Sequence, residues 1–245
     1  MAIEGKTVLA IVPARGGSKS IPRKNLAKVC GVSLVGHAGR LLNQLDWVDA
    51  KVLSTDDEEI AEEGEKAGLD VPFFRPDDLA SDTATSLDMW QQVWKASEDV
   101  YGIRFDISLL IEPTSPLRLP EDIERTALGV VQDGFSAAVT VSPTPAHFTP
   151  EKTLRLDDEG TIAYYIGQDG RHFHNRQAIP SYYHRNGICY ALTRQRLMDE
   201  KTILEGAKPI VIDRPLVNID EMIELELAGW LMERQGGARN KYAKK

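Results

Sequence analysis

A buried strand that runs directly into a glycine-rich, basic loop is the feature that most constrains this chain. Residues 8–12 read VLAIV, a short apolar and β-branched run of the kind that forms a strand buried on both faces. Pro13 ends this strand, and residues 14–26 follow as ARGGSKSIPRKNL. Glycines let a backbone approach a ligand and direct successive N–H groups toward it, while hydroxyls and cations add donors and charge. The pattern therefore predicts a loop that binds a polyphosphate.

Two common nucleotide-binding motifs do not fit this loop. The Walker pattern requires G-x-x-x-x-G-K-[ST], and the dinucleotide fingerprint requires G-x-G-x-x-G. Residues 14–26 contain neither pattern. A simple P-loop ATPase and a plain dinucleotide-binding protein are therefore disfavoured.

Acidic residues are missing from the region around this loop. Residues 5–45 contain no Asp or Glu, although 37 of the 245 residues are acidic. In proportion, about six acids would be expected there. An acidic chain, of net charge −8, that keeps one segment free of acids indicates an anion site in that segment. The cations in this window are Lys6, Arg15, Lys19, Arg23, Lys24, Lys28 and Arg40.

Composition excludes several classes of protein. The negative net charge and the local placement of the basic residues argue against general nucleic-acid binding. No apolar run approaches membrane-spanning length, and residues 1–7 (MAIEGKT) lack a signal-peptide core, so we expect a cytoplasmic protein with no membrane partner. Cys30 and Cys189 are too few and too far apart to indicate a disulfide framework or a zinc site.

Beyond the first loop, predicted strands and helices alternate. This alternation implies right-handed βαβ units, and hence an α/β fold with a mostly parallel, Rossmann-like sheet and helices on both faces. Trp90 and Trp94, four residues apart in one of the helices, are explained by core packing. Strands are predicted at residues 51–54, 71–74, 106–111 and 136–142, and helices at 33–45, 57–66, 84–100 and 120–132.

The alternation breaks between residues 143 and 185. Residues 153–156 and 161–166, with DDEG and QDG turns, predict hairpin strands. Aromatic and amide groups are abundant there, so we expect a β-rich insertion that lies over the site and offers a dimerisation surface. Residues 1–235 are otherwise expected to form a single domain, and residues 236–245 (GGARNKYAKK) a flexible basic tail. The remaining elements are predicted as strands at 187–193 and 209–212 and as a helix at 221–234.

Several polar residues stand at the ends of predicted strands. Glu112 follows strand 106–111, and Thr114 and Ser115 lie between prolines, which predicts a rigid polar shelf. Arg75 follows strand 71–74, where α/β proteins place ligand contacts, although a surface position is equally compatible with the pattern. The acids at 56–57 are better explained by helix capping than by metal binding, and capping is also the structural explanation for Asp220.

Six motifs in this order make the chain resemble the acylneuraminate cytidylyltransferases, which act on sialic and related nonulosonic acids. The resemblance extends from Val8 to about Leu231. KDO cytidylyltransferases are relatives with a different first loop and a different strand-end motif. The motifs are ARGGSKSIPRKN (14–25), STDD (54–57), RPDDLASDTATS (75–86), EPTSPLR (112–118), NRQAIPSYYHRNGICY (175–190) and NIDE (218–221).

The resemblance implies a nucleotidyltransferase that couples CTP to a 2-keto sugar acid, giving the CMP-sugar and pyrophosphate. It also implies assistance by Mg²⁺ or Mn²⁺, and we expect a homodimer. The implied catalytic residues are Arg15, Lys19 and Asp220, with Asp220 as the metal ligand. The implied nucleotide-binding residues are Ala14, Gly16, Gly17, Ser18, Lys24, Asn25, Arg75 and Ser86. The implied acceptor-binding residues are Glu112, Thr114, Ser115, Arg176, Gln177, Tyr183, Arg185 and Asn186.

The chain departs from the family pattern at three positions. Many members carry Asp where Asn218 stands, so a second carboxylate ligand is missing. Glu112 stands where sialic acid synthetases commonly carry Gln, and a carboxylate would repel an acidic sugar unless it met a hydroxyl, an ammonium or a metal. His184 occupies a position that is often Arg, which leaves Arg176 as the first candidate for binding the sugar carboxylate. For the general base, metal activation of the hydroxyl and Glu112 are alternative hypotheses.

Three other functions remain open at this stage. The first is a cytidylyltransferase of the same fold that uses KDO, an amino-KDO or a phosphonate. The second is a nucleotide-binding protein without transferase activity, which the substitution at Asn218 motivates. The third is a sugar-1-phosphate uridylyl- or guanylyltransferase. A panel of nucleotides and acceptors separates all of these.

Overall fold

A computed structural model describes residues 3–242, except residues 19, 82–83, 167–179 and 201; for residues 200 and 235–242 it describes the backbone only. Its centre is a six-stranded sheet of order β10-β6-β9-β5-β1-β4. The expected VLAIV strand is β1, the second strand from one edge of this sheet. The strands are β1 Val8–Pro13, β4 Ala50–Ser54, β5 Ile107–Leu110, β6 Ala137–Pro143, β9 Tyr183–Thr193 and β10 Lys208–Val211.

The sheet is mostly parallel, as the sequence predicts. β1 pairs in parallel with both β4 and β5, and β10 pairs in parallel with β6. β9 is antiparallel to both of its neighbours, β5 and β6. Its direction follows from its connection, because β6 leaves the sheet at Pro143 and the chain returns at Tyr183, directly opposite Pro143.

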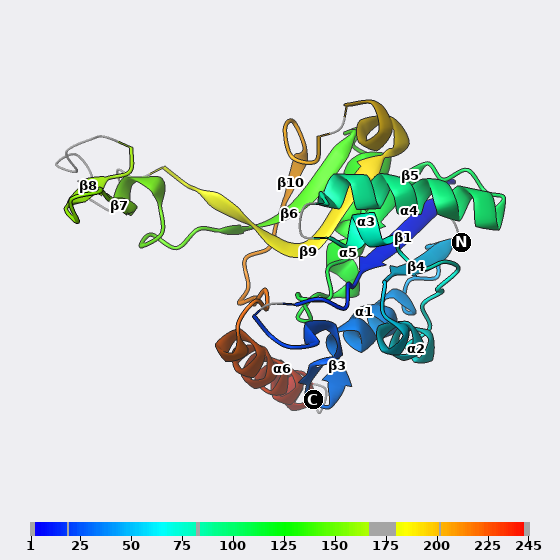
Figure 1. Cartoon of the computed structure of the whole chain (residues 1–245), viewed down its shortest axis with the longest axis horizontal. Coiled ribbons are helices and arrows are strands. Elements are labelled where there is room, and N and C mark those ends of the chain that lie inside the picture. The colour runs from blue at the N-terminus through cyan, green and yellow to red at the C-terminus, as the bar shows by residue number, and fades with distance from the viewer. Residues whose placement is uncertain (1–2, 19, 82–83, 167–179, 201, 243–245) are drawn as a thin grey trace.

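Helices cover both faces of the sheet (Figure 1). One face packs against α1 Leu34–Leu42, α2 Glu58–Lys66 and α5 Pro120–Val131. The other face packs mainly against α4 Ser86–Tyr101. Trp90 and Trp94 of α4 have no exposed surface, and the Trp90 indole N–H donates to Ser108 Oγ of β5 at 2.8 Å. The prediction that both tryptophans belong to the core is confirmed.

Local sequence signals set where these helices begin. Ser33 Oγ accepts the Gly36 N–H at 3.0 Å before α1, and Asp57 Oδ1 accepts the Ile60 N–H at 3.0 Å before α2. The predicted capping role of the 56–57 acids is therefore confirmed for Asp57. Pro120 opens α5, where a missing backbone N–H costs nothing.

A smaller third layer packs the C-terminal helix beside the first loop. The hairpin of β2 Lys28–Val29 and β3 Val32–Ser33 contacts α6 Met222–Tyr242. The backbone of α6 is helical as far as Tyr242, so residues 236–242 have helical backbone, while the flexibility of the tail stays a prediction. A glycine weakens a helix by about 1 kcal/mol but does not end it as proline does.

One predicted strand is absent among the described residues. Residues 71–74 form no strand; the chain only bridges the edge of the sheet, where Asp70 exchanges backbone hydrogen bonds with Lys51 and Leu53 at 2.8 Å. Pro72 lacks an N–H and cannot extend this ladder. The following residues instead form a short helix, α3 Asp77–Ala80. No described helix is long and apolar enough to cross a membrane.

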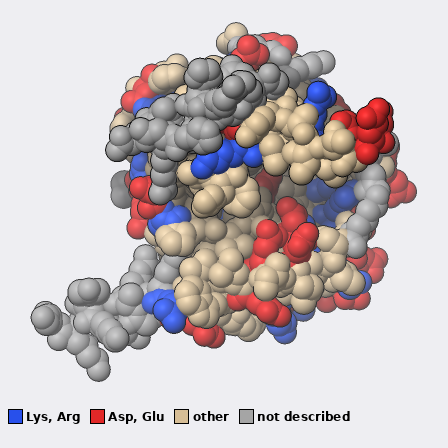
Figure 2. Space-filling model, turned by 90° about the vertical axis from the view of Figure 1, so that its left-hand side faces the viewer, with Lys and Arg blue, Asp and Glu red and all other residues tan. Residues whose placement is uncertain are grey.

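The described residues between β6 and β9 form an arm that projects away from the sheet (Figure 1). The predicted hairpin is present as β7 Leu154–Leu156 paired antiparallel with β8 Ile162–Tyr164. It does not lie over the site, which corrects the prediction, because β6 and β9 pair again beyond a register shift between Val139 and Val141 and carry the arm outward. Acidic and basic side chains are interspersed on the face seen from the arm side (Figure 2).

Candidate active site

The site lies where the strand order of the sheet reverses. From β1 the chain continues to β4 on one side and later to β5 on the other, so the switch point lies between β1 and β5. Open α/β sheets bind ligands outside the carboxyl ends of their strands at such a point. A cavity of about 480 Å³ opens there, lined by Pro13 and Arg15 at and after the end of β1 and by Leu110 and Glu112 at and after the end of β5.

Eight predicted site residues line this one cavity, although they come from four separate motifs of the sequence. Five of them were expected to bind the nucleotide or act on its phosphates, two to bind the acceptor, and one to hold a metal. Lys19, Arg176 and Gln177 lie outside the described residues. The eight residues are Arg15, Lys24, Asn25, Arg75, Ser86, Glu112, Thr114 and Asp220.

The first loop is packed against the end of β4. The Ala14 N–H donates to the Ser54 carbonyl at 2.9 Å, and the Gly16 N–H donates to Asp56 Oδ1 at 2.8 Å. A Cβ on Gly16 would lie 2.8 Å from Asp57 Oδ2, so this close approach requires glycine. The sequence predicts that loop N–H groups face a phosphate, and in the structure a carboxylate accepts one of them. Ala14, Gly16, Gly17 and Ser18 themselves do not line the cavity as described.

Asn25 and Arg75 form a rigid wall of the cavity. The Asn25 amide donates to the Arg15 carbonyl at 2.9 Å. Arg75 donates from Nε to Ser54 Oγ at 3.0 Å and from Nη2 to the Ser54 carbonyl at 2.7 Å. Burial lowers the pKa of Arg75, and the charge of Asp56 opposes this shift. Arg75 is therefore fixed to the end of β4, and Asn25 to the first residues of the loop that follows β1.

Lys24 and Asp220 meet across the mouth of the cavity. Lys24 Nζ lies 2.9 Å from Asp220 Oδ1, and the Asp220 side chain is 71% exposed. Asp220 is not the cap of α6. Instead, the Glu224 carboxylate accepts the backbone N–H groups of Asp220 at 2.6 Å and Glu221 at 2.9 Å. Among the described residues, no group of three or more His, Cys, Asp or Glu is placed to hold a metal ion.

Glu112 forms the floor of the cavity beside Gly187 of β9. Burial raises the pKa of Glu112, and the cations of Arg118 and Arg185 oppose the shift. Gly187 has φ +70°, and a Cβ there would lie 2.6 Å from Glu112 Oε2, 2.7 Å from Ser115 Oγ and 3.0 Å from Asn218 Nδ2. Only glycine lets these three segments approach one another so closely.

The other predicted acceptor residues lie behind or beside the cavity. Ser115 Oγ donates to the Asn186 carbonyl at 3.1 Å, and the Asn186 amide donates to Ser142 Oγ at 3.0 Å. Both residues are buried and join the shelf to the sheet. Arg185 is exposed, and Tyr183 lies on the arm opposite Pro143. Among the described residues, none from 144 to 185 lines the cavity, because β9 carries them outward.

Some residues in or near the cavity were not predicted as site residues. Ser81, Thr85 and Asn218 line the cavity, and Arg118 lies beneath its floor. Ser81 and Thr85 fall inside the motif at residues 75–86, and Arg118 ends the motif at residues 112–118. Membership in these motifs was the sequence feature that could have identified them.

Comparison with known proteins is consistent with this geometry. A family model described as cytidylyltransferase matches residues 9–229. A CMP-N,N'-diacetyllegionaminic acid synthase of Legionella pneumophila is 32% identical over 92% of this chain and 96% of its own length. A pseudaminic acid cytidylyltransferase of Campylobacter jejuni is 29% identical over 90% of this chain and 94% of its own length.

A solved structure shares the fold at low sequence identity. It is a CMP:2-keto-3-deoxy-manno-octonic acid synthetase complexed with CTP, with a TM-score of 0.69 at 17% identity. The match covers 94% of this chain and 99% of that structure. The predicted nucleotidyltransferase architecture is thereby confirmed at the level of the fold.

Proposed function

The chain belongs to the cytidylyltransferase family, and on this premise we propose that it couples CTP to a nonulosonic acid, giving the CMP-sugar and pyrophosphate. The observation that carries the proposal is the single cavity at the switch point. Cations and amides from the first loop and Arg75 line one side, while Glu112 and Thr114 from the end of β5 line the other. A nucleotide and an acceptor would therefore meet in one enclosed space of a size typical of small-molecule sites.

The proposed reaction is an in-line displacement at the α-phosphate of CTP. The anomeric oxygen of the sugar bonds to the α-phosphorus, the bond from that phosphorus to the bridging oxygen breaks, and pyrophosphate leaves with the electron pair. The hydroxyl proton is released. Negative charge grows on the α-phosphoryl oxygens and on the leaving group, and preorganised cations stabilise it most effectively in a water-poor site. Arg15 and Lys24 line the cavity and supply that charge, with Lys19 and Ser18 assigned to the same task.

On the nucleotide side, we assign Asn25, Arg75 and Ser86 to the cytidine end of CTP. Asn25 and Arg75 are held by hydrogen bonds to the Arg15 and Ser54 backbones, so their remaining polar edges stay oriented before the ligand arrives. Binding to a preorganised wall avoids the entropy of ordering side chains at that moment.

On the acceptor side, we assign Glu112 and Thr114 to hydroxyl or N–H groups of the sugar and a cation to its carboxylate. Arg176, with Gln177 beside it, remains our assignment for the carboxylate. Arg185 acts electrostatically on Glu112 and is the nearest described cation on β9. An ionised Glu112 accepts hydrogen bonds only, so it favours a sugar that presents donors at that position.

We further propose that Asp220 holds Mg²⁺ or Mn²⁺ together with the phosphates of CTP. The residues present fit this ion. Asp220 is an exposed carboxylate at the cavity, and Mg²⁺ is commonly bound by one or two carboxylates plus substrate phosphates and water. A bound divalent ion would neutralise phosphate charge. Lys24 also lines the cavity and pairs with Asp220, so it stands beside the position proposed for the ion and the phosphates.

We also propose that the arm mediates a homodimer. Both strands of the β7–β8 hairpin are almost wholly exposed, and a two-stranded hairpin is marginally stable by itself. Its apolar side chains would be covered by the same surface of a second copy. The largest exposed apolar side chains of the arm are Phe148, Leu156, Ile162 and Tyr165, which are 66–75% exposed.

The proposed function is tested by pyrophosphate release from CTP and Mg²⁺. The acceptor panel is N-acetylneuraminate, legionaminate, pseudaminate, KDO and an aminated KDO, with the other nucleoside triphosphates as controls. We expect release with CTP and at least one nine-carbon acid, and loss of release in Lys24→Ala and Asp220→Ala. Release only with KDO or only with another nucleotide would contradict the proposed specificity. CTP binding without release from any acceptor would favour a binding protein.

A further inference from the structure

A buried arginine lies directly beneath the acceptor side of the cavity. Arg118 follows the Thr114–Ser115 shelf and is only 5% exposed. Its Nη2 donates to the backbone carbonyl of Glu112 and, at 3.3 Å, to that of Gly187. Burial lowers the pKa of Arg118 to about 10, so its guanidinium remains charged at neutral pH.

The two carbonyls belong to the two backbones that hold the Glu112 side chain. Glu112 follows the end of β5, and Gly187 lies in β9, where an added Cβ would come within 2.6 Å of Glu112 Oε2. One guanidinium nitrogen, Nη2, therefore joins the segment that follows β5 to β9 beside Glu112. A lysine ammonium is a compact point charge on a flexible stem and lacks the rigid guanidinium plane that directs these two N–H groups.

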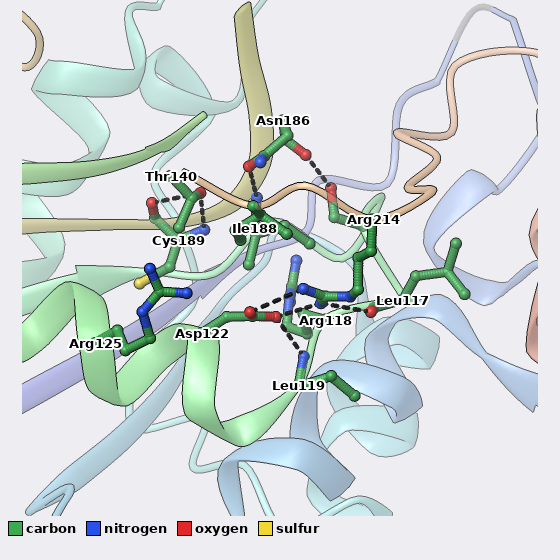
Figure 3. Close-up of polar contacts among 12 residues, drawn as sticks. Leu117, Arg118, Leu119, Asp122, Arg125, Thr140, Asn186, Ile188, Cys189 and Arg214 are labelled. Atoms are coloured by element: carbon green, nitrogen blue, oxygen red, sulfur yellow. Dashed lines mark hydrogen bonds and ion pairs between the residues drawn. The ribbon is translucent and has the colours of Figure 1, made fainter. Parts of the chain in front are cut away.

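A second arginine fixes the opposite side of the same region (Figure 3). Arg214 pairs through both terminal nitrogens with the Asp122 carboxylate and donates to the Leu117 carbonyl at 3.2 Å. Asp122 also accepts the Leu119 N–H at 2.8 Å, at the start of α5. The residues on both sides of Arg118 are thus tied to the helix and to the segment that carries Asn218 and Asp220.

That segment also meets the shelf directly. The Ile219 N–H donates to the Thr114 carbonyl at 2.8 Å. Arg118 itself forms no hydrogen bond or ion pair with a carboxylate among the described residues; its two hydrogen bonds go to backbone carbonyls. A buried cation that bonds to backbone rather than to an acid fixes the path of the chain more than it neutralises charge.

We propose that Arg118 is a positioning residue for acceptor binding: it clamps the Glu112 peptide against Gly187 and so sets the direction of the Glu112 carboxylate. This inference rests on the proposed function, in which Glu112 contacts the sugar. Arg118 does not touch the cavity, so it acts through Glu112. Its loss should therefore weaken the acceptor much more than CTP.

The test compares Arg118→Lys with the wild-type protein in steady-state kinetics and CTP titration. A misplacement of a binding group by about 1 Å can lower turnover by up to about 100-fold, so we expect the acceptor kcat/KM to fall by about 10- to 100-fold, mainly through KM. We expect the Kd of CTP to stay within about twofold. Arg194→Lys is the matched control. Arg194 is a half-buried arginine that forms a 3.1 Å ion pair with Glu98, and neither residue lines the cavity.

A double-mutant cycle shows whether Arg118 acts through Glu112. In a Glu112→Ala background, Arg118→Lys should change the acceptor KM by less than about twofold, since interacting residues are non-additive. Melting curves identify variants that fail to fold, and Arg118→Met then provides an uncharged side chain of similar length. Additive effects in the cycle, or equal losses of CTP and acceptor binding, would overturn the inference. If the wild-type protein released no pyrophosphate with any acceptor, the proposed function would be refuted instead.

Discussion

The two halves of strand β9 lie in opposite environments. Residues 186–192 are buried, and residues 190–192 pair with β5 on one side and with β6 on the other. Residues 183–185 are exposed and pair only with β6, at the base of the arm. One continuous strand therefore belongs both to a rigid catalytic sheet and to a surface that lacks covering in the single chain. The sheet half is stabilised by contacts within the chain, whereas the proposed dimer would cover the arm half with a second molecule.

The largest expected effect is a loss of turnover when a cavity residue is changed but not when a residue of the arm is changed. Arg15→Ala removes a cavity cation that stabilises developing phosphate charge, and loss of one such group typically lowers kcat by about 100- to 1,000-fold. Pyrophosphate release measures this loss. Arg155→Ala, on the exposed strand β7, is the matched control and should keep full turnover per active site. Equal losses in both variants would contradict the separation.

The next effect concerns the arm alone. Leu156→Asp combined with Ile162→Asp places two charges on the exposed apolar face of the hairpin. Burying an unpaired charge in an interface is costly, so we expect dimer affinity to fall by at least about 100-fold while the far-UV circular dichroism of the sheet is retained. Sedimentation velocity measures the oligomeric state, with Glu159→Gln in the hairpin turn as the control. A double variant that sediments like the wild-type protein would refute dimerisation through the arm.

A smaller effect tests the close contact in the sheet half of β9. Gly187→Ala incurs the strain of φ +70° and also brings a methyl group within 2.7 Å of two polar side-chain oxygens. Gly206→Ala has a similar φ of +71° but open space around the new Cβ, so it isolates the backbone strain. We expect the free energy of unfolding to fall by about 1–2 kcal/mol at Gly206 and by more at Gly187. Denaturant unfolding measures both free energies. Equal losses in the two variants would mean that the side chains around Gly187 move aside at no cost, which would contradict a close contact there.

The smallest expected effect is a pH dependence of folding stability caused by the Glu112 carboxyl group. Because burial raises the pKa of Glu112, the folded chain keeps this proton to higher pH than the unfolded chain does. Stability is therefore lost as the pH rises from the ordinary glutamate pKa through the raised one. Glu112→Gln removes this loss, so its melting temperature should exceed that of the wild-type protein at pH 8. The difference should shrink as the pH falls to 4, and a difference independent of pH would contradict the assignment.

The sequence predicted the elements of the central sheet and the hairpin of the arm, but it did not predict where the arm lies. Apolar runs such as residues 8–12 and caps such as Asp57 carry local signals, and both were confirmed. The cavity was also predictable, because residues at the carboxyl ends of parallel strands must converge at one edge. The direction in which the arm points could not be predicted, because it depends on the long β6–β9 ladder and not on any local pattern.

Other differences arise from tertiary contacts that no short motif encodes. Residues 71–74 have strand composition, but Pro72 and the sheet edge leave only one bridge at Asp70. The Gly16 N–H is accepted by Asp56, a residue forty positions later in the chain. Arg118 was inconspicuous in its motif because its function depends on two carbonyls that only folding brings together. Charge and hydrophobic patterns predict where side chains gather, but not which backbone atoms they contact.

The most direct test of the central claim follows the oxygen that is transferred. The acceptor that supports pyrophosphate release is prepared with ¹⁸O in its anomeric hydroxyl group and is incubated with CTP and Mg²⁺. If this oxygen attacks the α-phosphorus in the cavity between β1 and β5, the label will appear in the CMP-sugar and the pyrophosphate will be unlabelled. Mass spectrometry of both products measures this distribution. Label in the pyrophosphate, or a CMP-sugar without label, would contradict the account.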